Sequence, residues 1–148
     1  MAAPKVKVIL NSAQKLATVL KPQSIDVIFM SNFLEHLDTK DDVSNILYDA
    51  YKVLNSGGRL LIMQPDIRLV GSSYWDFFDH KVPITYQSLR EILEAIGFKI
   101  IYYRYPFLPY TTKLKLIPLN PLLLYFYIKL RPLHFIFGKQ FFICAKKI

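Results

Sequence analysis

The feature that most constrains this chain is an apolar run that ends in small polar side chains. Residues 25–30 are almost continuously apolar, which is typical of a parallel strand covered on both faces, and Ser31 and Asn32 follow directly. Apolar residues at helical spacing over 43–54 and a second apolar strand over 59–63 come next. This order predicts a right-handed β-α-β unit with a ligand site at the carboxyl ends of its strands.

Capping and turn residues mark where the elements begin and end. Asp38 or Thr39 can cap the helix over 43–54, and Gly57 and Gly58 are predicted to end it. The other expected elements are a strand at Val6–Leu10, helical turns over 12–20, a helix over 85–96, a strand over 98–104, a helix over 122–130 and a strand over 140–145. Strands and helices that alternate in this way indicate the α/β class.

These segments, in this order, resemble the second half of the class I S-adenosylmethionine (SAM)-dependent methyltransferases. The matching segments are Ser24–Phe29 for the fourth strand of the family, Leu34–Leu37 for the turn after it, Leu54–Leu60 for the fifth strand, Ala95–Phe98 for the sixth and 138–145 for the seventh. The resemblance implies a truncated Rossmann-like sheet, mostly parallel, with an antiparallel strand at its C-terminal edge. It implies one partial domain over 1–148, with a hydrophobic and aromatic excursion at 106–138.

The same resemblance implies SAM as the cofactor. Its adenine would lie beside Asn11, Ser12 and Ala13, after the strand at Val6–Leu10, and its methionine part beside Ser31, Asn32 and Phe33. None of the five glycines follows an N-terminal strand, so the glycine-rich cofactor loop of the family is absent. We therefore expect weak or absent SAM binding by this chain alone.

Two functions remain open at this point. The first is methyl transfer to a small-molecule or glycan-like acceptor, by a fragment of a complete enzyme. The second is a non-catalytic remnant or partner subunit of a split methyltransferase, whose partner is the missing N-terminal half or a second copy of the chain. Whether the chain is an enzyme is left open by its sequence.

Candidate site residues lie in the turn after the first strand and in two aromatic loops. His36, Asp79 and His80 are candidates for general base chemistry, because histidine titrates near neutral pH. Candidate contacts to the acceptor are Glu35, Tyr74, Trp75, Phe77, Tyr110 and Lys113. The alternative for both sets is a structural role in the turn or in an aromatic lid. His36, His80 and His134 lack ligand spacing, so no metal site is expected.

The composition of the chain indicates which partners it binds and in which compartment of the cell it lies. The net charge is +8, but the cations are scattered singly, which does not favour nucleic acid as a partner. Cys144 lies in an apolar run, so we expect a buried thiol in a cytoplasmic protein. The apolar stretch over 122–128 is too short to span a membrane. Because aromatic residues and cations alternate over 125–139, this part of the chain is either a hydrophobic lid, the favoured interpretation, or a peripheral membrane contact.

Overall fold

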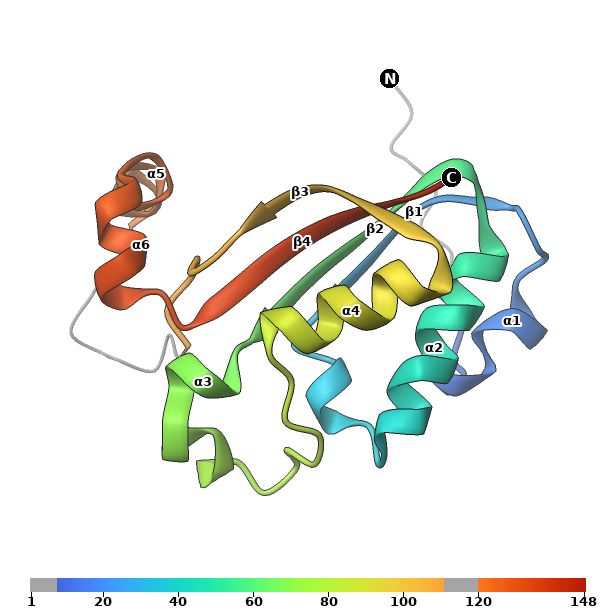
Figure 1. Cartoon of the computed structure of the whole chain (residues 1–148), viewed down its shortest axis with the longest axis horizontal. Coiled ribbons are helices and arrows are strands. Elements are labelled where there is room, and N and C mark those ends of the chain that lie inside the picture. The colour runs from blue at the N-terminus through green and yellow to red at the C-terminus, as the bar shows by residue number, and fades with distance from the viewer. Residues whose placement is uncertain (1–7, 111–119) are drawn as a thin grey trace.

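The computed structural model describes residues 8–110 and 120–148, and its four strands form one sheet (Figure 1). The strands are β1 (Ile25–Ser31), β2 (Leu54–Pro65), β3 (Phe98–Arg104) and β4 (Gln140–Lys147), in the spatial order β1-β2-β4-β3. β1 pairs with β2 in parallel, and β4 runs antiparallel to both β2 and β3. β1, β2 and β3 therefore point the same way, and the predicted α/β class with a Rossmann-like sheet is confirmed. The sheet is mixed rather than mostly parallel as predicted, because only the β1–β2 pairing is parallel.

The last strand lies inside the sheet, so the prediction that it forms the edge is wrong. Ile143 of β4 is paired with Ile62 of β2 on one side and with Tyr103 of β3 on the other. Both edges of β4 are paired with neighbouring strands, and the alternating residues Phe141, Ile143 and Ala145 are fully buried on the face that the helices cover. In the part of the chain that the structure describes, β1 and β3 form the edges.

Helices cover one face of this sheet. α1 (Leu16–Val19), α2 (Lys40–Val53) and α4 (Tyr86–Ile96) lie on the same side of the strands (Figure 1). Each longer helix buries one apolar stripe, as predicted from the spacing. The stripes are Val43, Ile46, Leu47, Ala50 and Val53 on α2, and Tyr86, Leu89, Leu93 and Ile96 on α4. Together with Leu60, Ile62 and Phe141 of the sheet they form the core.

Both helices begin as predicted, but α2 ends differently. The Thr39 hydroxyl caps α2 by accepting a hydrogen bond from the Asp42 backbone N–H, and Asp42 Oδ2 accepts one from the Thr39 backbone N–H. α2 ends at Val53, so the prediction that Gly57 and Gly58 end it is wrong. The chain can pass straight into β2 without a glycine because Lys147 Nζ donates to two carbonyl oxygens at the end of the helix, Tyr51 O at 2.6 Å and Leu54 O at 2.8 Å.

The opposite face of the sheet and the outer edge of β1 are open. Val27 and Phe29 of β1 are 55% and 61% exposed, so the prediction that this strand is covered on both faces is wrong for the described residues. Residues 8–10 form no strand, and the rest of the strand predicted at Val6–Leu10 lies outside the described residues. Nothing in the ranges 8–110 and 120–148 therefore pairs with the free edge of β1.

Two helices follow the undescribed segment before β4. α5 (Pro121–Lys129) and α6 (Arg131–Phe137) stand beyond one end of the sheet (Figure 1). The interpretation of this region as a packed lid is wrong for most of its apolar side chains, because Leu122, Phe135 and Ile136 are 60%, 74% and 67% exposed. Among the described residues, no helix is long and apolar enough to cross a membrane.

Candidate functional site

A buried hydrogen bond joins the carboxyl ends of β1 and β2. Glu35 lies in the short helix η2 (Leu34–His36) after β1, and Gln64 lies near the end of β2. Gln64 Nε2 donates to Glu35 Oε2 at 2.5 Å, and the two residues are only 0% and 1% exposed. The other side-chain oxygens, Glu35 Oε1 and Gln64 Oε1, have no hydrogen-bond partner among the described residues. An unsatisfied buried carboxylate oxygen costs free energy, so Glu35 Oε1 is available to bind a hydrogen-bond donor or a cation.

The loop after β2 folds back over Glu35. It contains α3 (Ile67–Val70) and η3 (Gly71–Asp76), and after a turn at 77–79 it continues without regular structure to α4. The backbone N–H groups of Lys81 and Val82 both donate to the Glu35 carbonyl oxygen, at 2.8 and 3.1 Å. Tyr74 is fully buried and donates its hydroxyl to the Val82 carbonyl at 2.6 Å. The loop is thus fixed against the end of β1 by backbone hydrogen bonds that no local pattern encodes.

This folding brings together the three residues predicted as catalytic. The rings of His36 and His80 lie 4.9 Å apart between centroids. His36 Nδ1 is 3.2 Å from the carbonyl oxygen of Asp79 and 3.2 Å from its Oδ2, and His80 Nδ1 is 2.9 Å from the Tyr74 carbonyl oxygen. A carbonyl oxygen only accepts hydrogen bonds, so these contacts assign a hydrogen to each Nδ1 and leave Nε2 as the ring nitrogen that can meet another group.

The predicted acceptor contacts divide into a packed group and an exposed group. Phe77 stacks on His80 with ring centroids 5.1 Å apart, and Tyr110 meets Phe77 edge-on at 5.6 Å. Trp75 is 54% exposed beside this cluster. Lys113 lies outside the described residues. The aromatic loop therefore forms one wall next to the histidines, while the indole of Trp75 stays accessible to a ligand.

Acidic side chains give this region a negative potential. Burial, and after it the charges of Glu35, Asp76 and Asp79, raises the pKa of Tyr110 to about 12. Burial, and after it the charge of Glu35, raises the pKa of Tyr74 as well. Both phenols are therefore harder to ionise than a free tyrosine, and the neighbouring carboxylates favour a bound cation.

The predicted cofactor contacts lie at two places. Ser31 ends β1, Asn32 follows with a φ of 45°, and Phe33 packs against the core. A left-handed backbone is uncommon outside glycine, although asparagine tolerates it, and such residues cluster at functional sites. Residues 11–13 are exposed and lie at the start of η1 (Ala13–Lys15), before α1.

Sequence reasoning missed two buried polar residues at the end of β2. One is Gln64, which donates a hydrogen bond to the Glu35 carboxylate. The other is Asp66, which is fully buried and caps both following helices, since its Oδ1 accepts from the Arg68 N–H at 2.9 Å and its Oδ2 from the Tyr86 N–H at 2.8 Å. The available signal was a polar residue on each side of Pro65, where the apolar strand ends: Gln64 comes directly before this proline and Asp66 directly after it.

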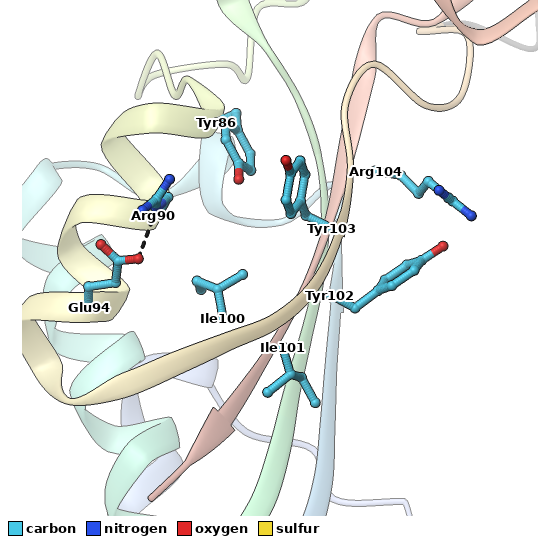
Figure 2. A pocket seen from close by; sticks show the side chains of 8 residues that line it. All are labelled: Tyr86, Arg90, Glu94, Ile100, Ile101, Tyr102, Tyr103 and Arg104. Atoms are coloured by element: carbon cyan, nitrogen blue, oxygen red, sulfur yellow. Dashed lines mark hydrogen bonds and ion pairs between the residues drawn. The ribbon is translucent and has the colours of Figure 1, made fainter. Parts of the chain in front are cut away.

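A separate groove of about 490 Å³ lies between α4 and β3 and shares no residue with the Glu35 cluster (Figure 2). Tyr86 and Tyr103 face one another across it, with ring centroids 5.2 Å apart, and Arg90 Nε pairs with Glu94 at 2.8 Å. It is an open feature of the β3 edge and does not contain the unsatisfied polar atoms found at the Glu35 cluster. We therefore place the candidate site at the carboxyl ends of β1 and β2.

Comparison with solved structures identifies the fold. The chain is similar to a SAM-dependent methyltransferase from Archaeoglobus fulgidus, with a TM-score of 0.68 and 21% identity over 97% of this chain and 68% of that one. A SAM-dependent methyltransferase from Thermotoga maritima gives a TM-score of 0.66 and 18% identity over 97% of this chain and 65% of that one. The protein thus has the Rossmann-like fold of the SAM-dependent class I methyltransferases, and it spans about two thirds of the length of these chains.

The family comparison agrees with the fold. Residues 1–62 match the family of the methyltransferase domain, so the resemblance predicted from sequence is confirmed. A comparison with curated proteins found no match. The family match over residues 1–62 and the fold of the structural neighbours are therefore both those of a methyltransferase domain.

Among the described residues, only those expected to contact the methionine part of SAM are present at the end of a strand. Ser31, Asn32 and Phe33 end β1 at the position where the methionine part is expected. The glycine-rich loop is absent from the sequence, and the edge of β1 toward which it would lie has no neighbouring strand in the described residues. Close approach of a backbone to a nucleotide requires such glycines.

Proposed function

We propose that this chain forms the acceptor side of a SAM-dependent methyltransferase that acts on a small-molecule or glycan-like acceptor. The observation that carries this proposal is the cluster of Glu35, His36 and His80 at the carboxyl ends of β1 and β2, beside an accessible aromatic wall. In open α/β sheets this is the position at which ligands bind. The fold and the family match support it.

The cofactor, when bound, supplies an electrophilic methyl group on its sulfonium. The task of this chain is then to bind and orient the acceptor, since positioning provides much of the rate in such transfers. Trp75 can stack on an acceptor ring, and Glu35 Oε1 can accept a hydrogen bond from an acceptor hydroxyl. His36 Nε2, with Nδ1 held by Asp79, is placed to take the proton of a nucleophilic hydroxyl or amine.

The second candidate is a partner subunit that binds no cofactor on its own. The free edge of β1 and the exposed Val27 and Phe29 favour this candidate, because an uncovered apolar sheet edge recruits another chain. The partner would be the N-terminal half of a methyltransferase or a second copy of this chain. A cytoplasmic location is compatible with both candidates and is part of the proposal.

Calorimetric titration with S-adenosylhomocysteine separates the two candidates. Binding at micromolar strength by the chain alone would support a working cofactor site, and Asn32→Ala should then weaken the binding. A folded chain that shows no binding would favour the partner subunit. In that case sedimentation of the chain and of Phe29→Lys, with Phe78→Lys as an exposed control, would test pairing of two copies through β1.

A further inference from the structure

The cluster after β1 has the composition and the geometry of a metal site. One ligand atom from each of Glu35, His36 and His80 lies within 4.8 Å of the others. We propose that these three side chains bind one divalent transition-metal ion of the Zn²⁺ class. The inference concerns ion binding by this chain, and it stands whether or not the chain transfers methyl groups. With the ion bound, Glu35 and His36 would serve as its ligands in place of the acceptor contact and the base role proposed above.

The hydrogen bonds around the three side chains leave one ligand atom free on each. His36 Nδ1 lies against the Asp79 carbonyl oxygen, and His80 Nδ1 against the Tyr74 carbonyl oxygen, so Nε2 is the ring nitrogen that each leaves for an ion. Glu35 Oε2 accepts from Gln64, which leaves Oε1. Histidines that bind metals usually donate their other nitrogen to a carboxylate or carbonyl, and bound carboxylates are themselves hydrogen-bonded. The outer contacts of a metal site are therefore in place.

The unsatisfied oxygen of Glu35 points to a missing cation. Glu35 is 1% exposed, and its Oε1 has no hydrogen-bond partner in the described part of the chain. His36 Nε2 lies 3.8 Å from this oxygen, which is too far for a hydrogen bond. Lys81, which follows His80, is engaged at the surface by Asp38. A metal ion between Glu35 and the two imidazoles would neutralise the carboxylate and complete its coordination.

The ligand set selects a transition metal over magnesium or calcium. Two imidazoles and one carboxylate suit zinc or iron(II), whereas the alkaline-earth ions prefer oxygen ligands alone. Tetrahedral coordination at about 2.1 Å places ligand atoms roughly 3.4 Å apart, so separations of up to 4.8 Å must close by up to about 1.4 Å. The His36 side chain is 34% exposed and can make that movement. The exposed side also leaves a coordination position open for water or an acceptor oxygen.

Titration of the metal-stripped chain with Co²⁺ and Zn²⁺ tests this proposal. We expect one ion per chain with a Kd in the micromolar range or tighter, and visible d–d absorption from Co²⁺ that Zn²⁺ abolishes. Glu35→Gln and His80→Gln should each weaken the affinity at least tenfold. Glu91→Gln, an exposed carboxylate on α4, is the matched control and should bind as the unchanged chain does.

Wild-type chain alone also gives a decisive readout. The sequence has three histidines, and Zn²⁺ should shift the imidazole NMR signals of His36 and His80 while leaving those of the buried His134 unchanged. This measurement holds even if a substituted chain fails to fold. Millimolar or weaker binding, equal shifts of all three histidines, or folded Glu35→Gln that binds as tightly as wild type would overturn the proposal.

Discussion

Lys147 should stabilise the fold by closing the C-terminal end of α2. Its ammonium donates to Tyr51 O at 2.6 Å and Leu54 O at 2.8 Å, and it lies 4.7 Å from the centroid of the Tyr51 ring. Lys147→Met keeps the apolar stem but leaves both carbonyl oxygens unpaired. Hydrogen bonds to a charged group contribute about 1.5–3 kcal/mol each, and the cost of burying the ammonium offsets part of the sum. We expect a net loss of about 3 kcal/mol in the free energy of unfolding.

Urea denaturation followed by circular dichroism measures this loss, and thermal unfolding gives a second estimate. At roughly 2–4 °C per kcal/mol for a chain of this size, Tm should fall by about 6–12 °C. The matched control is Lys146→Met, since Lys146 is the exposed neighbour on the same strand, and it should change stability by less than about 0.5 kcal/mol. Equal effects of the two substitutions would refute the argument that Lys147 closes the helix.

Three further predictions follow from the same contacts. Tyr74→Phe removes the hydrogen bond to the Val82 carbonyl and should cost about 1–2 kcal/mol in urea unfolding, and an unchanged midpoint would contradict this. The pKa of Tyr110 is raised to about 12, so the unfolded chain loses this proton first, and stability should fall as pH rises from about 10 to 12. Tyr110→Phe should make that fall shallower in pH-dependent urea titrations, and an identical slope would count against it. Phe135→Ser combined with Ile136→Ser should reduce flotation with anionic vesicles, whereas the exposed control Leu10→Ser should not, and equal flotation would exclude α5 and α6 as a membrane contact.

Local signals in the sequence were sufficient to predict most of the helices and strands. Thr85 and Gly97 bound α4 as expected, because a cap and a left-handed C-terminal residue act within a few positions of the helix. β3 was placed at Phe98–Arg104 from its apolar and aromatic composition. The end of α2 could not be placed in this way, since its carbonyls are satisfied by Lys147, which lies 96 and 93 residues away in the chain.

The candidate site was predictable as a list of residues but not as an arrangement. Glu35 and His36 follow a strand directly, which is a local signal. His80 joins them only because the backbone N–H groups of Lys81 and Val82 donate to Glu35 O, and nothing in the spacing of the histidines reports that contact. The expectation that no metal site exists depended on that spacing. Because the folded loop brings His80 next to Glu35 and His36, the spacing along the chain no longer argues against a metal site, and we propose one there.

The apolar residues on the open face of the sheet are the strongest argument that another layer packs there. A strand with one face in water usually alternates apolar and polar residues. β1 instead has Val27 and Phe29 on its open side, at 55% and 61% exposure, beside the buried Met30. This pattern is that of a strand covered on both faces, while the described residues cover only one. A second layer would bury these side chains, and in the proposed methyltransferase it would be the part that brings the rest of the cofactor site against Ser31 and Asn32.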